Sequence, residues 1–500
     1  MTIKETGSLV GTDPESIAIS APDRPSLPHG LLSEQTLSAG GQLKSLQVGG
    51  DDRVAIVLPN GPAMASAFVC LSPWCATAPL NPAYKTDEYE FYLNDLDAKI
   101  LLVETGSTSP ALDVANGLGI KIVELQEGEA AGSFSLDAAD GEAMSRDDDA
   151  IALILHTSGT TSRPKMVPLS QANIAASAKN ISATLSLTPD DICLNVMPLF
   201  HIHGLMAPVL ASLSSGASVH ATPGFDALRF FNWLEEAKPS WYSAVPTMHQ
   251  AILSRAPRNT DVIEVASLRF IRSSSASLPP QVMAALEETF GAPVIEAYAM
   301  TEAAHQMCSN PLPPEARKPG CVGPAAGPEV TIMNDVGEEL ISGDEGEIVI
   351  RGPNVTSGYL ANPEANATAF HEGGWFRTGD QGIMDEDGYV KVTGRSKEII
   401  NRGGEKIAPL EIDEVILDHE AVAQVCSFAV PHDKLGEDVG AAIVLHDGAE
   451  ISEKEIREFT ATRLADFKVP RVIVFVDEIP KGATGKIQRI GLAKALGLAQ

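Results

Sequence analysis

The stretch "IALILHTSGTTSRPK" (residues 151–165) places an unbroken apolar run directly before a loop of small polar residues. The apolar run predicts a buried strand. The loop contains Gly159, which lets the backbone turn so that several N–H groups point at one anion, and it ends at Lys165, whose charge suits phosphoryl oxygens. The loop differs from the G-x-x-x-x-G-K-[ST] pattern of Walker loops. These residues alone favour a phosphate-binding loop and an ordinary polar turn about equally.

On both sides of this stretch, apolar runs alternate with helical patterns over roughly the first 300 residues. Strands are expected at residues 53–60, 98–104, 149–159, 240–246 and 267–279, and helices at 61–74, 230–239 and 280–291. Such alternation predicts a mostly parallel sheet covered by helices. After about residue 320 the runs alternate apolar and polar residues between Gly and Asp turns, which indicates an antiparallel β unit.

The fold class expected is therefore α/β with two domains. A large N-terminal domain, residues 1–396, would hold mostly parallel sheets with helices and a β-barrel-like unit. A small, mobile α+β domain, residues 397–500, would follow it as a lid, with helices at 408–419 and 452–467. The acidic, Gly- and Ala-rich stretch 127–149 is expected to be an exposed loop.

Composition excludes several classes of function. The 500 residues carry a net charge of −30, which argues against a nucleic-acid partner but leaves room for a small anion in a local site. The six cysteines form no CxxC pair, so a zinc site or redox couple is not expected. No apolar run approaches the length of a membrane span and the first residues lack the apolar core of a signal peptide, so a cytoplasmic protein is expected.

Three further stretches carry side chains suited to nucleotide chemistry. "GGWFRTGDQG" (373–382) holds Asp380 in a Gly-bounded turn, where a carboxylate can accept hydrogen bonds from a ribose diol. "AYAMTEAAH" (297–305) offers an aromatic ring, a hydroxyl and a carboxylate suited to Mg²⁺. "PKGATGKIQR" (480–489) sets Lys486 in a glycine loop. Taken singly, each is equally an ordinary turn, a helix N-cap or a solubilising lysine.

Together and in this order, these motifs resemble the adenylate-forming superfamily of acyl-CoA synthetases, luciferases and peptide-synthetase adenylation domains. "HTSGTTSRPK", "RSSSASLP", "AYAMTE", "WFRTGD", "GRSKEIINRGGEKI" and "PKGATGKIQR" span nearly the whole chain. The form "SGTTSRPK" is similar to the oxalate–CoA ligase branch of that superfamily.

The resemblance implies a reaction in two steps and a set of residues for the first step. A carboxylic acid attacks the α-phosphate of ATP and releases pyrophosphate, and the thiol of coenzyme A then displaces AMP. The catalytic residues would be Lys486, which bridges carboxylate and phosphate, Thr301, and Glu302, which binds Mg²⁺. The nucleotide would be bound by Thr157, Ser158, Gly159, Thr160, Thr161, Lys165, Ala276, Glu296, Ala297, Tyr298, Thr301, Asp380, Arg395 and Lys486.

For the second step the resemblance implies rotation of the C-terminal domain about Lys397. The rotation would withdraw Lys486 and bring Gly403 and Gly404 to the pantetheine tunnel, which a side chain would block. The cofactors and partners expected are ATP, Mg²⁺, coenzyme A and a small carboxylic acid, and the oligomeric state stays open.

The acid pocket would be formed around His203, Ser275 and His305, whose polar groups are costly to bury beside an alkyl chain and suit a second carboxylate. Oxalate is therefore the first expectation and malonate the second. His203 as an ordinary core residue, a medium-chain fatty acid as the substrate, and a carrier-protein thiol as the acceptor remain alternatives. The pocket segment 195–204 shows no Asp of the kind that holds an amino acid's α-amino group, which lowers the carrier-protein alternative.

Overall fold

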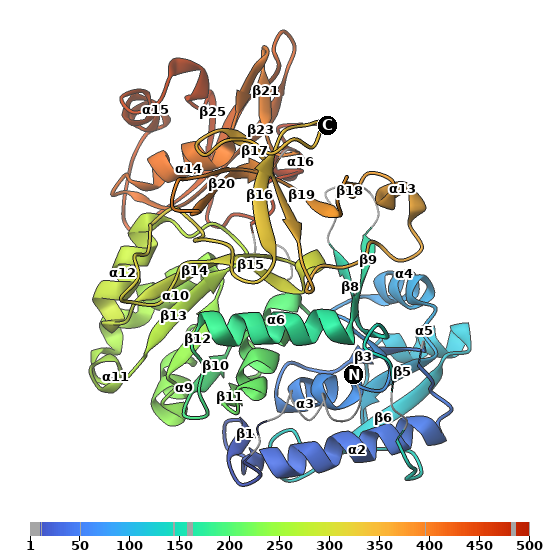
Figure 1. Ribbon diagram of the computed structural model, residues 1–500. Helices are drawn as coiled ribbons and strands as arrows, with labels where there is room; N and C mark the ends of the chain where they lie inside the picture. Colours follow the sequence, from blue (N-terminus) through green and yellow to red (C-terminus); the bar gives the residue numbers. More distant parts are fainter. Residues whose placement is uncertain are drawn as a thin grey trace.

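The computed structural model describes residues 11, 13–50, 52–143, 146–157, 164–395, 397–481 and 487–499. Two large, mostly parallel sheets lie side by side, and a third sheet and the C-terminal region lie above them (Figure 1). The α/β fold class expected from the alternating pattern is confirmed, including the antiparallel sheet that follows the parallel ones and a smaller C-terminal α+β part.

The first sheet has seven strands in the order β7-β6-β5-β3-β4-β8-β9. Their bounds are β3 (Arg53–Val57), β4 (Ala76–Pro79), β5 (Ile100–Glu104), β6 (Lys121–Glu127), β7 (Phe134–Leu136), β8 (Ile151–Thr157) and β9 (Lys165–Ser170). The apolar run 151–155 is indeed a strand, and it pairs antiparallel with β9 to form a hairpin whose connection is the predicted phosphate loop. Residues 158–163 of that loop lie outside the described residues.

The second sheet has eight strands in the order β15-β14-β13-β12-β10-β11-β1-β2, and the pairs from β14 through β1 are parallel. The strands are β1 (Ile17–Ser20), β2 (Leu27–Pro28), β10 (Ile192–Asn195), β11 (Ser218–Ala221), β12 (Trp241–Ala244), β13 (Phe270–Ser274), β14 (Val294–Met300) and β15 (His305–Ser309). Because the carboxyl ends of parallel strands meet at one edge, the segments after β10, β12, β13 and β14 come together there.

Helices cover these sheets. They are α2 (His29–Ser45), α3 (Pro62–Leu71), α4 (Thr86–Leu96), α5 (Ala111–Leu118), α6 (Gln171–Thr184), α9 (Phe230–Ala237), α10 (Pro246–Arg255), α11 (Thr260–Val265) and α12 (Pro280–Phe290). A further helical stretch runs from α7 (Ile202–Gly204) through a π-helical segment (Leu205–Ala211) to α8 (Ser212–Ser214). In Figure 1, α6 crosses in front of the two sheets, and its apolar residues share one core cluster with residues of both.

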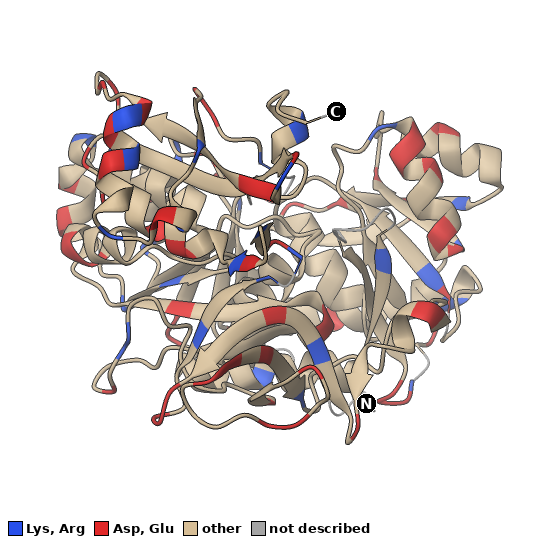
Figure 2. Ribbon diagram, turned by 90° about the horizontal axis from the view of Figure 1, so that it is seen from above, with Lys and Arg blue, Asp and Glu red and all other residues tan. Residues whose placement is uncertain are grey.

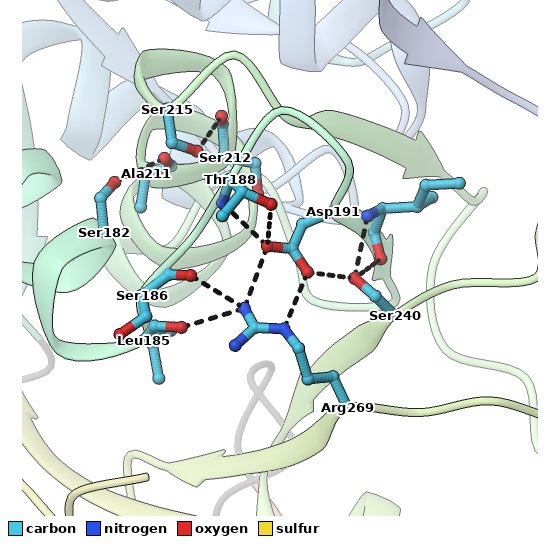
Figure 3. A network of polar contacts seen from close by, with 11 residues as sticks. Ser182, Leu185, Ser186, Thr188, Asp191, Ala211, Ser212, Ser215, Ser240 and Arg269 are labelled. Atoms are coloured by element: carbon cyan, nitrogen blue, oxygen red, sulfur yellow. Dashed lines mark hydrogen bonds and ion pairs between the residues drawn. The ribbon is translucent and has the colours of Figure 1, made fainter.

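An ion-pair network around the buried Asp191 lies at the amino edge of the second sheet (Figure 3). Asp191 stands just before β10, Ser240 just before β12, and Arg269 just before β13. Arg269 donates from Nε and Nη2 to the two carboxylate oxygens of Asp191, each at 3.0 Å, and Ser240 donates to Asp191 Oδ1 at 2.6 Å. Arg269 also donates to the carbonyl of Leu185, at the end of α6. These contacts occupy the amino ends of the strands. The carboxyl ends, at the opposite edge of the sheet, are where a binding site is expected.

The third sheet is antiparallel and contains β16 (Glu329–Met333), β17 (Glu345–Arg351), β18 (Phe370–His371), β19 (Trp375–Met384) and β20 (Val390–Arg395), with the short helix α13 (Pro363–Asn366) beside it. Beyond it, the C-terminal sheet contains β21 (Ile400–Arg402), β22 (Glu405–Ile407), β23 (Val422–His432), β24 (Gly436–Leu445) and β25 (Val472–Phe475), with helices α14 (Pro409–Leu417), α15 (Glu453–Ala461) and α16 (Leu492–Ala495). This region has a core of its own, within residues 400–473.

Two local expectations were wrong. The acidic stretch 127–149 is not wholly an exposed loop, because β7 pairs with β6 and Ala131 and Leu136 are buried. The helix expected over 452–467 ends at Ala461, and a 3₁₀ turn (Asp466–Lys468) follows it. Within the described residues, no helix is long and apolar enough to cross a membrane. Figure 2 shows Asp and Glu spread over the whole molecule with fewer Lys and Arg among them, as the net charge of −30 requires.

Candidate active site

A cleft of about 700 Å³ opens at the carboxyl edge of the second sheet, between that edge and the C-terminal region. Its walls come from both parts of the chain. The body contributes Ser275, Ala276, Ala297, Tyr298, Asp380 and Arg395, and the C-terminal region contributes Leu410, Asp413, Glu414 and the segment 487–490. These six body residues are ones that the sequence predicted to bind nucleotide or acid, and they share the wall with other residues of the body. The structure therefore brings together motifs more than 100 residues apart.

The predicted ribose site is an ion-paired cluster. Asp380 on β19 lies opposite Arg395 on β20, and Arg395 Nε lies 3.1 Å from Asp380 Oδ1. The hydroxyl of Tyr298, at the end of β14, donates to Asp380 Oδ2. Burial raises the pKa of the Asp380 carboxyl even though Arg395 and Tyr298 favour its charged form. A carboxylate whose position is fixed by a cation and a phenol is well suited to accept hydrogen bonds from hydroxyl groups.

The walls beside this cluster are small and apolar, apart from one buried acid. Ala276 and Ala297 line the cleft, and their small side chains leave space for a flat ring such as the predicted adenine. Glu296 is 3% exposed and lies behind the wall, where its Oε1 accepts the N–H of Leu278 at 2.8 Å. Burial raises the pKa of Glu296 to about 8, so this carboxyl is largely protonated at neutral pH. Of the predicted nucleotide residues on β14, Glu296 is therefore placed behind Ala297 and Tyr298.

Three residues predicted for the phosphate end, Lys165, Thr301 and Glu302, do not line the cleft itself, although Pro164 beside Lys165 does. Lys165 is the first residue of β9, so its side chain stands at the base of the predicted loop. Glu302 is 7% exposed in the 3₁₀ turn after β14 (Thr301–Ala303), and burial raises the pKa of its carboxyl. Thr157, the last residue of β8, faces Lys165 across the hairpin. The predicted residues Ser158, Gly159, Thr160 and Thr161 lie outside the described residues.

A magnesium ion fits this end only together with a nucleotide. The described parts of the chain contain no group of three or more His, Cys, Asp or Glu side chains that could hold a metal ion. Mg²⁺ commonly binds through one or two carboxylates plus substrate phosphates. The single buried carboxylate of Glu302, near Lys165, matches that second arrangement.

The three residues predicted to recognise the acid do come together, but in two layers. Ser275 lies on the cleft wall, whereas His203 and His305 are fully buried behind it. His203 Nδ1 lies 3.0 Å from Ser275 Oγ, and the rings of His203 and His305 stack with centroids 4.9 Å apart. The first contact offered to an acid in the cleft is thus the serine hydroxyl, and the imidazoles support it.

The structure adds a residue that the sequence reasoning missed. Arg272, on β13, is fully buried, and its Nη1 lies 3.1 Å from His305 Nε2 and 3.5 Å from Ser243 Oγ. Ser243 in turn lies 2.7 Å from His203 Nε2. Among the described residues no carboxylate forms an ion pair with Arg272, and burial lowers the pKa of its guanidinium to about 9. The signal was an arginine inside the otherwise apolar strand "FIRSS".

Backbone strain marks the same place. Ser275, Ala304 and His305 all have positive φ values, of 76°, 47° and 98°, although none is glycine. Such conformations cost free energy and persist where the surroundings enforce them, often at functional sites. Here Ser177 on α6 donates to the carbonyl of Ala304 and fixes the turn that carries His305.

The residues expected to act in the second step lie in the C-terminal region. Lys397 stands two residues after Arg395, the last residue of β20, and the next residue, Glu398, lines the cleft. Gly403 and Gly404 form the turn of the β21–β22 hairpin with φ values of 61° and 101°, and neither lines the cleft. Their conformation alone favours glycine. Lys486 lies outside the described residues, although Ile487 and Arg489 directly after it line the cleft.

Comparison with known proteins decides the family. Residues 10–360 match the family model described as AMP-binding enzyme, and residues 411–486 match AMP-binding enzyme C-terminal domain. This chain belongs to the AMP-binding enzyme family. The resemblance read from the motifs is confirmed, and so is the enzyme class, an AMP-forming acid–CoA ligase that acts through an acyl-adenylate.

Relatives of this AMP-binding enzyme match most of its length. An oxalate–CoA ligase of Arabidopsis thaliana is 46% identical over 489 residues, which cover 95% of each chain. An oxalate–CoA ligase of Saccharomyces cerevisiae is 43% identical, over 89% of this chain and 86% of its own. The crystal structure of ATP-bound MatB from Rhodopseudomonas palustris superposes with a TM-score of 0.90 at 29% identity, over 99% of each chain.

Proposed function

We propose that this enzyme is an oxalate–CoA ligase, which converts oxalate, ATP and coenzyme A to oxalyl-CoA, AMP and pyrophosphate. The observation that carries the proposal is the buried guanidinium of Arg272. A fully buried cation that pairs with no carboxylate of the described chain favours an anion nearby. The distal carboxylate of a short dicarboxylic acid supplies that anion, whereas acetate or a fatty acid does not.

A hydrogen-bonded chain connects the cation to the cleft. It runs from Arg272 through Ser243 and His203 to Ser275, with the distances given above. Ser275 donates to the distal carboxylate, and His203 orients the serine hydroxyl. Because oxalate has no methylene group, its binding depends on polar partners of this kind, and such sites reject analogues that leave the partners unpaired. The names of the two relatives with 46% and 43% identity support the same acid.

The remaining residues take the roles expected from the sequence. Asp380 and Arg395 hold the ribose, with Tyr298, Ala276 and Ala297 around the adenine and Glu296 behind them. Lys165 and the loop 157–161 hold the phosphates. Glu302 would hold Mg²⁺, which would supply positive charge beside the phosphoryl groups. Lys486 acts on the carboxylate and α-phosphate, and Thr301 donates to the same phosphate.

We further propose a domain boundary at residues 396–397, with Lys397 as the hinge. Its support is the separate apolar core of residues 400–473 and the position of the cleft between the two parts. In the second step Gly403 and Gly404 line the path of coenzyme A.

The test is pyrophosphate release from ATP, with and without coenzyme A, for oxalate, malonate, acetate and hexanoate. Oxalate should give the highest kcat/KM, and coenzyme A should accelerate turnover. His305→Ala should raise KM for oxalate strongly and leave KM for ATP nearly unchanged, since the nucleotide lies elsewhere in the cleft. A higher kcat/KM for hexanoate than for oxalate, or an unchanged KM for oxalate in His305→Ala, would contradict the assignment of oxalate.

A further inference from the structure

Tyr359 touches both side chains that stand at the phosphate end of the site. Its hydroxyl donates to Glu302 Oε1 at 2.9 Å, and Lys165 Nζ lies 4.2 Å from the centroid of its ring. The three residues come from the turn after β14, from the start of β9, and from the segment before α13. The side chain of Tyr359 therefore makes two contacts: its hydroxyl donates a hydrogen bond to a carboxylate, and its aromatic face lies against a cation.

The position of Tyr359 is fixed by its backbone. Its N–H donates to Asn366 Oδ1 at 2.7 Å, and the amide of Asn366 donates back to the carbonyl of Tyr359 at 2.8 Å. The N–H of Leu360 donates to Met166 on β9 at 2.9 Å, and the N–H of Thr356 donates to the carbonyl of Glu302 at 2.7 Å. The segment is thus bonded to both elements that it bridges, which makes it a rigid support.

We propose that Tyr359 is a positioning residue for the Mg²⁺-bound triphosphate, an inference that rests on the nucleotide site proposed above. Its hydroxyl donates to one oxygen of Glu302 and so fixes the orientation of the carboxylate that would hold Mg²⁺. Its ring holds the ammonium of Lys165 beside the site before the nucleotide arrives. Lys165 is then ordered in advance, which lowers the entropic cost of engaging a phosphate.

Two substitutions separate the two contacts. Tyr359→Phe removes the hydroxyl and keeps the ring, so it should alter only the part of binding that depends on Mg²⁺. ATP binding measured by calorimetry in EDTA should stay within about twofold of wild type, and binding in excess Mg²⁺ should weaken by roughly tenfold, the factor for one charge-assisted hydrogen bond. Tyr359→Leu removes both contacts and should weaken ATP binding by roughly threefold to tenfold already in EDTA.

A matched control exists elsewhere in the chain. Tyr389 donates its hydroxyl to the backbone carbonyl of Ala316, and Lys318 Nζ lies 4.2 Å from its ring, so it also combines a hydroxyl hydrogen bond with a cation–ring contact, away from the cleft. Tyr389→Phe should bind ATP as the wild type does under both conditions. Thermal unfolding of all three variants shows whether a loss of binding follows a loss of folded protein.

Glu302→Gln and Lys165→Ala, measured in the same way, distinguish the two possible failures. If neither changes ATP binding, the proposed nucleotide site is wrong. If both weaken binding while Tyr359→Phe binds like wild type in Mg²⁺, the site stands and the role of Tyr359 is overturned. Equal weakening of Tyr359→Phe with and without Mg²⁺, together with a lower unfolding temperature, would likewise overturn it, because the side chain would then only support the fold.

Discussion

Replacing Arg272 with methionine should stabilise the fold and impair the enzyme for oxalate. Methionine is unbranched and fills a similar space without a charge. Burial lowers the pKa of Arg272 from its ordinary 12.5 to about 9, so holding the charge costs up to roughly 5 kcal/mol in the folded state. The hydrogen bonds to His305 and Gln306 offset part of this cost. Replacing a buried ion pair and its partner by apolar groups stabilises by about 1–4 kcal/mol, and leaving His305 and Gln306 without this partner reduces the gain, so we expect the free energy of unfolding to rise by less than that range's upper end.

The loss of activity follows from the position of the charge. The contacts that lead from Arg272 to Ser275, of 3.5, 2.7 and 3.0 Å, place the guanidinium within about 10 Å of the cleft wall. At an effective dielectric constant of about 20, a unit charge at that distance contributes roughly 1.7 kcal/mol. The kcat/KM for oxalate should therefore fall by roughly 20-fold. Acetate has no distal carboxylate, so its kcat/KM should change little.

Urea unfolding and steady-state kinetics with both acids test this reasoning, and Arg269 provides the control. Arg269→Met breaks the network of Figure 3 and leaves Asp191, which is 3% exposed, without its cationic partner. That variant should be less stable and should lose activity equally with oxalate and acetate. If Arg272→Met behaves in the same way, its role is structural and the acid assignment loses its main support.

Three further outcomes follow from the site. Lys486→Ala should nearly abolish adenylate formation and spare thioester formation from supplied oxalyl-AMP, and equal loss in both half-reactions would contradict its role. Lys397→Pro should do the converse, because proline fixes φ and resists the hinge rotation; unchanged overall turnover would exclude the hinge. Glu296 has a pKa of about 8 in the folded protein, so the folded state binds its proton more tightly than the unfolded state and stability falls as pH rises from about 4.5 to 8. Glu296→Gln should flatten that fall in denaturation measured at pH 6 and pH 9, and an unchanged slope would refute the shifted pKa.

The sequence was most informative where one physical rule decides the outcome. Alternating apolar runs predicted parallel sheets, and such sheets gather the carboxyl ends of their strands at one edge. This is why His203 and Ser275, which follow β10 and β13, meet although 72 positions separate them. Asp380 could likewise be predicted as a site residue, but its bond from Tyr298 depends on how the third sheet packs against β14.

The sequence could not predict how deeply each polar side chain is buried in the fold. His305 and Ser275 are both polar residues in predicted pocket segments, yet only Ser275 reaches the cleft wall. Arg272 was missed because a charged residue in a strand is ordinarily one that faces solvent, and nothing local shows that this one points into a packed core. Leu136 shows the reverse case, a residue expected at the surface that is buried. The composition of the surrounding stretch 127–149 suggested an exposed loop, but β7 pairs with β6 and buries Leu136.

The excess of acidic side chains over the surface bears on how the substrates arrive. The proposed acid, oxalate, is an anion, as are ATP and coenzyme A, and each approaches a molecule whose net charge is −30. At long range the field therefore opposes every productive encounter, and attraction begins only within the cleft, near buried or paired cations. Added salt screens charges separated by more than about 10 Å at 0.1 M, so it weakens the repulsion more than the attraction. We therefore expect moderate ionic strength to assist capture by this enzyme, the opposite of what holds for proteins that steer their ligands electrostatically.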